Sequence, residues 1–168
     1  KLVDALPTDE GWQFEPKWDG FRCLSFRSGN DVELRAKSGK TLSRYFPEVV
    51  AALRALPVKQ FAVDGELAIP VGAKLSFDAL QLRLHPAESR VRKLASETPA
   101  IFILFDCLQG ARKTNLMTKP LSERRDALEA FYDSLASPGL LRLSPYTRSR
   151  AQAQRWLDRA GGALDGVI

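Results

Sequence analysis

The stretch that most constrains this chain is Glu15-Pro16-Lys17-Trp18-Asp19-Gly20-Phe21-Arg22, where charged and large aromatic side chains are concentrated. Apolar residues alternate on both sides of it, with Trp12 and Phe14 before it and Phe21 and Cys23 after it. Such alternation is typical of strands, and an Asp-Gly dipeptide between two strands indicates a turn. The stretch therefore predicts two strands that meet beside a lysine.

Lys17 can be interpreted in two ways. It lies next to Trp18 and two residues from each of two carboxylates, Glu15 and Asp19. An aromatic neighbour and a facing guanidinium, such as that of Arg22, disfavour the ammonium form and can make the amine nucleophilic. The alternative is an ordinary surface hairpin in which Lys17 pairs with Glu15 or Asp19. The spacing alone leaves both interpretations open.

The remaining sequence mixes strand and helix patterns, which predicts a single α+β domain. The run from Ile101 to Leu108 is short, apolar and rich in β-branched and aromatic residues, so it is expected to be a central strand. The predicted strands are 12–17, 20–27, 32–37, 61–69, 101–108, 140–146 and 163–168. The predicted helices are 47–56, 77–85 with Ser76 as its cap and Leu84 facing inward, a short one capped by Ser89 that ends near Ala95, one capped by Ser122 that ends near Leu135, and 149–160.

Several common kinds of site are absent from the sequence. It contains no G-x-x-x-x-G-K-[ST] phosphate loop and no G-x-S-x-G nucleophile elbow. The one histidine, His85, cannot form a His-based metal site, and Cys23 and Cys107 match neither a disulfide framework nor a zinc spacing. Both cysteines lie in apolar runs and are expected to be buried thiols. No segment is apolar enough over a sufficient length to suggest a membrane span.

The charged residues that interrupt apolar strands carry the most information. A carboxylate in a buried strand gains nothing unless it is paired or bound to a cation. The residues of this kind are Lys17, Glu66, Asp106 and Asp165, with Asp19 and Asp64 beside them.

The overall charge is compatible with a polyanionic partner. The net charge is +5 and the pI is near 9.4, although proteins that never bind nucleic acid often share such values. Between Phe77 and Pro99 a basic run could follow a phosphate backbone, or it could be a solvated helix face. Its members are Arg83, Arg90, Arg92 and Lys93.

The octapeptide resembles the K-x-D-G-x-R signature of the covalent nucleotidyltransferases, which are DNA ligases, RNA ligases and mRNA-capping enzymes. The longer text from Gly11 to Arg22 is similar to bacterial ATP-dependent DNA ligases, and within them to the short stand-alone C-type ligases of actinobacteria. The resemblance covers residues 10–168. It implies the ATP-grasp-like fold of these enzymes, with antiparallel sheets flanked by helices and the nucleotide pocket between them.

Within the first motif the resemblance implies that Lys17 is the catalytic nucleophile. Glu15 and Arg22 are implied as nucleotide-binding residues, with Arg22 on the ribose or phosphate side. Asp19 and Gly20 are expected to support the site.

Two further motifs lie on predicted strands. Val63 to Leu67 looks like the third family motif, in which Glu66 would contact the ribose and help to place the metal. Phe102 to Asp106 looks like the next one, in which Phe105 would stack on adenine and Asp106 would hold a neighbouring loop. The alternatives are a carboxylate on the wet face of an edge strand for Glu66 and a core position for Phe105.

The last two motifs are less complete. Lys37 stands where the family usually has an arginine that binds the nucleotide or the DNA end, and it lacks the bidentate fork of arginine. The alternative is a solvated hairpin tip. Leu164 to Ile168 resembles the fourth motif, whose carboxylate, Asp165 here, binds the metal. Its alternative is a simple Asp-Gly turn.

The mechanism implied by the resemblance is attack of Lys17 on the α-phosphorus of ATP, with Mg²⁺ or Mn²⁺ neutralising the phosphate oxygens. The AMP on Lys17 would then pass to the 5′-phosphate at a nick in double-stranded DNA, during DNA repair or recombination. The resemblance further implies a monomer without membrane association, in the bacterial cytoplasm and associated with the nucleoid.

The resemblance also sets expectations about extent. Residues 1–168 are expected to be an adenylation domain that is incomplete at its C-terminus, without the fifth motif and the OB-fold domain, and unable to seal a nick. Two other functions remain open. One is an RNA ligase or a capping-type enzyme that would share Lys17, and the other is a non-catalytic basic nucleic-acid-binding domain.

Overall fold

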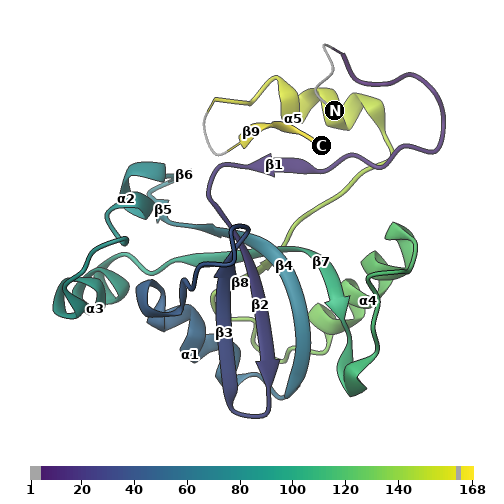
Figure 1. The fold of residues 1–168 in the computed structure, drawn as a ribbon. Coiled ribbons are helices and arrows are strands. Elements are labelled where there is room, and N and C mark those ends of the chain that lie inside the picture. Colours follow the sequence, from purple (N-terminus) through teal and green to yellow (C-terminus); the bar gives the residue numbers. More distant parts are fainter. Residues whose placement is uncertain (1–4, 162–163) are drawn as a thin grey trace. The chain divides into compact units, whose positions relative to one another are not determined.

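A computed structural model describes residues 5–161 and 164–168. The chain forms two compact units, of which the larger is Gly20–Leu143 and the smaller combines Lys1–Asp19 with Ser144–Ile168 (Figure 1). The boundary between the units falls between Asp19 and Gly20, so it divides the Asp-Gly dipeptide of the first motif.

The larger unit is built on a five-stranded sheet in the order β3-β2-β4-β7-β8. Its strands are β2 (Phe21–Ser28), β3 (Asp31–Ala36), β4 (Gln60–Ala68), β7 (Ile101–Gln109) and β8 (Leu141–Leu143). Neighbouring strands are antiparallel except for β7 and β8, which are parallel. The predicted α+β class with antiparallel-rich sheets is confirmed.

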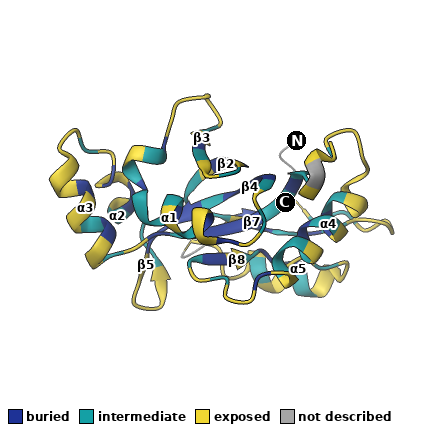
Figure 2. Cartoon of the chain, turned by 90° about the horizontal axis from the view of Figure 1, so that it is seen from below, coloured by how far each residue is buried: buried dark blue, intermediate teal, exposed yellow. Residues whose placement is uncertain are grey.

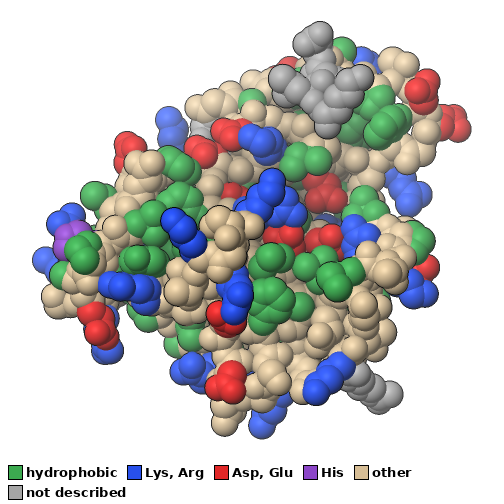
Figure 3. All heavy atoms as spheres, in the orientation of Figure 1, with side chains coloured by type: hydrophobic (Ala, Val, Ile, Leu, Met, Phe, Trp, Pro, Cys, Tyr) green, Lys and Arg blue, Asp and Glu red, His purple; other side chains and the backbone are tan. Residues whose placement is uncertain are grey.

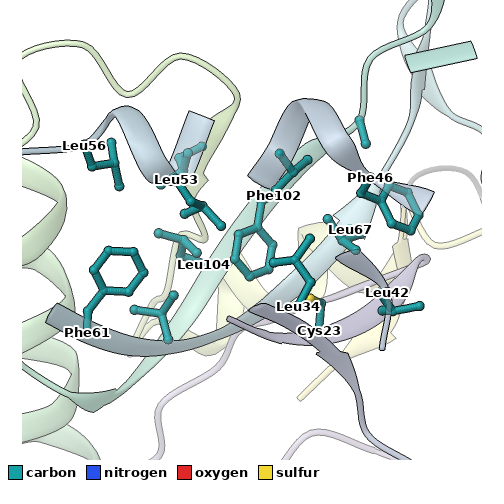
Figure 4. Packing of buried hydrophobic residues seen from close by; sticks show 14 of the residues in the cluster. Cys23, Leu34, Leu42, Phe46, Leu53, Leu56, Phe61, Leu67, Phe102 and Leu104 are labelled. Carbon is teal, nitrogen blue, oxygen red and sulfur yellow. The ribbon is translucent and has the colours of Figure 1, made fainter. Parts of the chain in front are cut away.

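Helices α1 (Pro47–Ala55) and α4 (Leu121–Asp133) pack on one face of this sheet. Figure 4 shows Leu53 and Leu56 of α1 above Phe61, Phe102 and Leu104 of the sheet, all of them buried. From α4, the ring of Phe131 lies 5.0 Å from that of Phe61, centroid to centroid. The opposite face of the sheet does not pack against these two helices, so it can carry polar and charged side chains.

The two cysteines lie in this core, as predicted. Burial raises the pKa of the Cys23 thiol to about 12 and that of the Cys107 thiol to about 11. Both side chains are fully buried and therefore stay protonated and unreactive near neutral pH.

Several shorter elements differ from the predictions. Helix α2 (Phe77–Gln81) ends four residues before the predicted boundary at 85, because the chain then turns and Arg83 enters the interior. Its predicted cap is confirmed, since the Ser76 hydroxyl accepts a hydrogen bond from the Ala79 N–H at 3.2 Å.

The predictions for Ser89 and Ser122 as helix caps are wrong, because α3 (Glu88–Glu97) and α4 already begin one residue earlier. The elements that were not predicted are β5 (Pro70–Val71), β6 (Lys74–Leu75), η1 (Ser43–Tyr45) and η2 (Ala111–Lys113).

Burial follows the sheet (Figure 2). Strand β4 is almost entirely buried, whereas α3 is exposed except at Val91, Ala95 and the half-buried Leu94. In the part of the chain that the structure describes, no helix combines the length and the apolar character that crossing a membrane requires.

Arg27 of β2 is a buried cation that backbone carbonyls hold in place. Its guanidinium donates to five of them: Nε to Gly29 at 3.0 Å, Nη1 to Leu53, Leu56 and Val58 at 2.8, 2.7 and 2.9 Å, and Nη2 to Arg54 at 2.7 Å. The carbonyls of a last helical turn have no partner within the helix, and Arg27 supplies donors to those of α1. Burial lowers the pKa of Arg27, and the neighbouring charge of Arg54 lowers it further.

The smaller unit pairs β1 (Pro16–Trp18) antiparallel with β9 (Leu164–Val167), and α5 (Arg150–Leu157) packs against β9. The predicted strand 12–17 is wrong in its first part, because β1 begins at Pro16. Before it, Phe14 forms an isolated bridge with Thr147, and Glu15 exchanges backbone hydrogen bonds with Ile168. The predicted strand 163–168 corresponds to β9, although residue 163 lies outside the described residues.

Bulges interrupt β7 and β9. In β7 the pairs Gly65–Leu104 and Asp64–Asp106 leave Phe105 as an extra residue. In β9 the pairs that Lys17 and Trp18 make with Gly166 and Leu164 leave Asp165 as an extra residue. A bulge re-aims side chains, because it breaks the alternation of faces along a strand.

Candidate active site

Lys17 is held at the surface of β1 by a carboxylate from the other end of the sequence. Its Nζ lies 2.6 Å from Oδ2 of Asp165, 148 residues away, and both side chains are about half exposed. The bulge in β9 directs Asp165 to this position. The next residue of β1 is fixed as well, because Trp18 donates from Nε1 to the Ser144 hydroxyl at 2.9 Å. A purely local surface hairpin does not account for this long-range pair.

In the larger unit, the sheet face opposite α1 and α4 carries a group of charges. We call it the charged face, and its defining residues are Arg22, Asp64, Glu66, Phe105 and Asp106. Arg22 and Glu66 are register partners on β2 and β4. Arg22 donates from Nη2 to Asp64 at 2.7 Å and from Nε to both carboxylate oxygens at 3.2 and 3.3 Å. The hydrogen bond to Asp64 raises the pKa of Arg22, and the charges of Asp64, Glu66 and Asp106 raise it further against the opposing effect of burial.

The bulge in β7 brings Phe105 and Asp106 together on the charged face. The Arg22 guanidinium carbon lies 5.6 Å from the Phe105 ring centroid, and Phe105 is half-buried. The core position is instead taken by Phe102, which is fully buried. Asp106 accepts from Nε of Arg124 at 2.9 and 3.1 Å, and Arg124 also donates to the Lys119 carbonyl at 2.8 Å. Asp106 thus holds the start of α4 and the segment before it.

Gly20 is required for close approach. A Cβ at this position would collide with the carbonyl oxygen of Leu67 and would lie 2.8 Å from Cγ of Glu66. Any side chain here would therefore displace Glu66 or the end of β4. This is a packing reason for glycine in addition to the predicted turn.

A pocket of about 810 Å³ opens beside Arg22 in the larger unit. This volume lies in the range of ligand-binding pockets. One part of the lining is cationic, with Arg22 and Lys37 joined by Lys40. The rest is largely apolar or hydroxylic: Gly20, Phe21, Ala36, Ser38, Thr41, Leu42, Tyr45 and Leu84. The predicted inward direction of Leu84 is wrong, because this side chain is exposed and lines the pocket.

Three of the four cations of the basic run between 77 and 99 are buried or paired, and the fourth, Arg90, is exposed on α3. Arg83 is fully buried, and Arg92 and Lys93 pair with Glu88 and Glu97 on their own helix. Figure 3 shows Lys and Arg side chains mixed with acidic and hydrophobic ones on the face that it draws. The solvated helix face is the better interpretation of this run.

The two units divide the site residues that the sequence predicts. The smaller unit holds Glu15, Lys17, Asp19 and Asp165, and the larger unit holds Gly20, Arg22, Lys37, Glu66, Phe105 and Asp106. Glu15 accepts from Nε2 of Gln13 at 2.7 Å. Sequence patterns alone do not single out Arg124, Tyr45 or Leu84 as site residues, since an arginine on a helix and apolar residues near helices are common everywhere.

The donor groups fit a magnesium ion only in the company of a nucleotide. Within residues 5–161 and 164–168, no group of three or more His, Cys, Asp or Glu side chains could hold a metal ion. Mg²⁺ is, however, usually bound through one or two carboxylates together with substrate phosphates and water. Glu66 in the larger unit and Asp165 in the smaller unit each present one carboxylate.

Comparison with known proteins gives a consistent result. The family described as "ATP dependent DNA ligase domain" matches residues 3–168. "DNA ligase C" of Mycobacterium tuberculosis (strain H37Rv) is 48% identical over 171 residues, which cover 100% of this chain and 47% of that protein. The chain thus spans about half the length of this curated relative. The predicted similarity to C-type ligases is confirmed.

Solved structures show the same fold. The crystal structure of the ligase domain of M. tuberculosis LigD superposes with a TM-score of 0.72 at 25% identity, over 94% of this chain and 47% of that one. A mycobacterial DNA ligase D complexed with ATP and MES superposes with a TM-score of 0.64 at 22% identity, over 93% of this chain and 46% of that one.

Proposed function

Because this chain belongs to the family of ATP-dependent DNA ligase domains, we propose that it carries out the first step of ligation, the transfer of AMP from ATP to Lys17. In this step the neutral amine Nζ attacks the α-phosphorus, the bond from the α-phosphorus to the oxygen that bridges to the β-phosphate breaks, and pyrophosphate leaves with that oxygen. The nitrogen gives up one of its two protons to the solvent and keeps the other. Lys17 then carries AMP as a phosphoramidate. The observation that carries the proposal is a half-exposed lysine amine, fixed by Asp165, within the K-x-D-G-x-R motif.

Asp165 has two tasks in the proposed step. It orients Nζ through the contact at 2.6 Å, and it would offer its carboxylate to a divalent ion. A divalent ion, Mg²⁺ or Mn²⁺, held by Asp165 and Glu66 would neutralise the phosphate oxygens and favour the neutral amine.

The charged face and the pocket beside it supply the nucleotide contacts in this proposal. Arg22, which Asp64 fixes through two nitrogens, would contact the ribose or the phosphates, and Lys37 would add a second cation. Glu15 and Glu66 would bind the nucleoside. Phe105 presents a half-buried ring to the adenine, while Asp19, Gly20 and Asp106 support the site.

Replacing Phe105 by leucine is expected to weaken ATP binding by about 1–3 kcal/mol, the usual contribution of an aromatic ring stacked on a base. The fold should be little affected, because Phe105 is an extra residue of β7 and the core position belongs to Phe102. ATP affinity and thermal unfolding would be measured together. Phe105→Tyr keeps a ring and should bind ATP as the unchanged protein does. Equal affinities for all three proteins would argue against stacking.

Replacing Glu66 by glutamine, or Asp165 by asparagine, is expected to raise the Mg²⁺ concentration for half-maximal adenylation by at least about tenfold. Even a group that merely orients a metal ligand changes metal affinity by this factor. Asp133→Asn, an exposed change on α4, is the matched control. If both site variants keep the metal dependence of the control, these carboxylates are structural.

The later steps are part of the same proposal. AMP would pass from Lys17 to the 5′-phosphate at a nick in double-stranded DNA, and the 3′-hydroxyl would then displace it. We place the protein as a monomer in the bacterial cytoplasm, associated with the nucleoid. Covalent transfer of a label from the α-phosphate of ATP, with GTP as comparison, tests the proposal. Labelling by GTP alone would indicate a capping-type enzyme, and no labelling would indicate a binding domain.

A further inference from the structure

Arg83 is the largest fully buried side chain of the larger unit, and it is hydrogen-bonded to Tyr45 and adjacent in sequence to Leu84, two residues of the pocket lining. Its relative exposure is 0%. From Nη2 it donates to both carboxylate oxygens of Glu48 at 2.8 Å and to the Tyr45 carbonyl at 2.9 Å. The guanidinium carbon is 5.0 Å from the ring centroid of Phe46. Glu48 also accepts from the Ala100 N–H at 3.0 Å, so the pair joins α1 to the start of β7.

Stability is a poor explanation for this buried ion pair. Apolar residues of similar volume are often as stabilising as a buried ion pair, or more so. The pair is also incompletely satisfied: Nη1 makes a long hydrogen bond of 3.4 Å to the Thr98 carbonyl, and Nε has no partner among the described residues. What the pair provides is a fixed geometry.

A second arginine, on η1, makes a hydrogen bond back to the segment that contains Arg83. Arg44 of η1 donates to the Pro86 carbonyl at 2.8 Å, and its guanidinium carbon lies 5.0 Å from the ring centroid of Tyr45. Two side-chain hydrogen bonds therefore join segment 83–86 to η1. Arg83 of the segment donates to a carbonyl of η1, and Arg44 of η1 donates to a carbonyl of the segment. Leu84 lies between the two attachment points, with 48% of its surface exposed and its side chain in the pocket lining.

We propose that the Arg83–Glu48 pair is a positioning element that holds Tyr45 and Leu84 as a preformed apolar wall in the pocket that the cations Arg22 and Lys37 also line. A wall of this kind beside two cations suits the sugar-phosphate part of a nucleotide, whose sugar contacts the apolar groups while its phosphate meets the positive charge. The unit can come from ATP or from a DNA strand. The inference rests on the proposed function and adds the element that shapes its pocket.

The first test compares two neighbouring leucines in the intact protein. Leu84 lines the pocket, whereas Leu82, which is 51% exposed, does not. Leu84→Ser is expected to raise the ATP concentration for half-maximal adenylation, or the Kd for a nicked duplex with a 5′-phosphate, by about tenfold, because misplaced binding groups cost factors of this size. The adenylation rate at saturating ATP should stay within about twofold, since no group that touches the reacting atoms is lost. Leu82→Ser should change none of these values.

The second test removes the pair itself. In the double variant Arg83→Met with Glu48→Gln, the amide can still accept from Ala100, so folding is retained while the connection to Tyr45 is lost. This double variant is also expected to raise the ATP concentration for half-maximal adenylation, or the Kd for the nicked duplex, by about tenfold. If the double variant does not fold, the leucine comparison decides alone.

The proposal is overturned if Leu84→Ser matches Leu82→Ser in both measurements. It is also overturned if the folded double variant binds both ligands as the unchanged protein does. These outcomes are distinct from failure of the proposed function, which would appear as absence of labelling in the unchanged protein.

Discussion

Replacement of Lys17 by alanine or arginine is expected to abolish the covalent AMP adduct, with a fall of at least about a thousandfold in the rate of labelling by α-labelled ATP. Alanine removes the amine. Arginine keeps the positive charge and can keep the pair with Asp165, but its guanidinium stays protonated and cannot attack phosphorus. The measurement is the acid-labile label that remains on the denatured protein.

The two substitutions separate chemistry from structure. If only alanine lost the label, a structural role of the Lys17–Asp165 pair would be indicated. The matched control is Lys93→Ala, because Lys93 is an exposed lysine that pairs with Glu97 on α3. Labelling of the Lys17→Arg protein at the level of this control would rule out Lys17 as the nucleophile.

Replacement of Arg27 by methionine is expected to lower the free energy of unfolding by about 3–5 kcal/mol. Methionine fills much of the space but removes the donor from five carbonyls, of which those of Leu53 and Leu56 are buried and the other three partly buried. Each buried acceptor that loses its partner is costly, and partial relaxation limits the total. Urea-induced unfolding measures the change.

Arg54→Met is the matched control for this experiment. Arg54 lies on α1, the helix whose last carbonyls accept from Arg27. The exposed side chain of Arg54 donates one hydrogen bond, to the Asn30 carbonyl at 3.0 Å. Its removal should change the free energy of unfolding by no more than about 0.5 kcal/mol. Similar losses for the two variants would show that the carbonyl cluster is not what Arg27 stabilises.

The long strands and α1 were predictable because their apolar residues repeat with one clear period. Strand β4 could be recognised although Asp64 and Gly65 interrupt it, since the residues on both sides are buried. The predicted strand from residue 12 failed because Trp12 is exposed, so the alternation there does not reflect a buried face. The sequence predicts too long a helix at α2 because the spacing of Leu84 groups it with the core residues, whereas Arg83 occupies the interior.

The site was predictable only as a set of residues. The motif text indicated Lys17 and Asp165, but their contact depends on a bulge, and a bulge leaves no period in the sequence. Likewise, strict alternation would place Phe105 and Asp106 on opposite faces, whereas the structure has both on the charged face. The partner of Asp106, Arg124, belongs to a helix whose docking only the packed structure defines.

Because of the extra residue in β7, the residue that packs in the core and the residue that presents its side chain on the charged face are different ones. The pairs next to Phe105 are consecutive on β4, so Phe105 behaves as an insertion at this point of the ladder, and a second shift leaves Leu108 as another extra residue. Its neighbour Leu104 meets the requirements of the core, and Asp165 stands in the same relation to the ladder of β9. The side chain at an inserted position can change without a compensating change in the sheet. Ligand preference and fold stability can therefore evolve at separate positions of one strand.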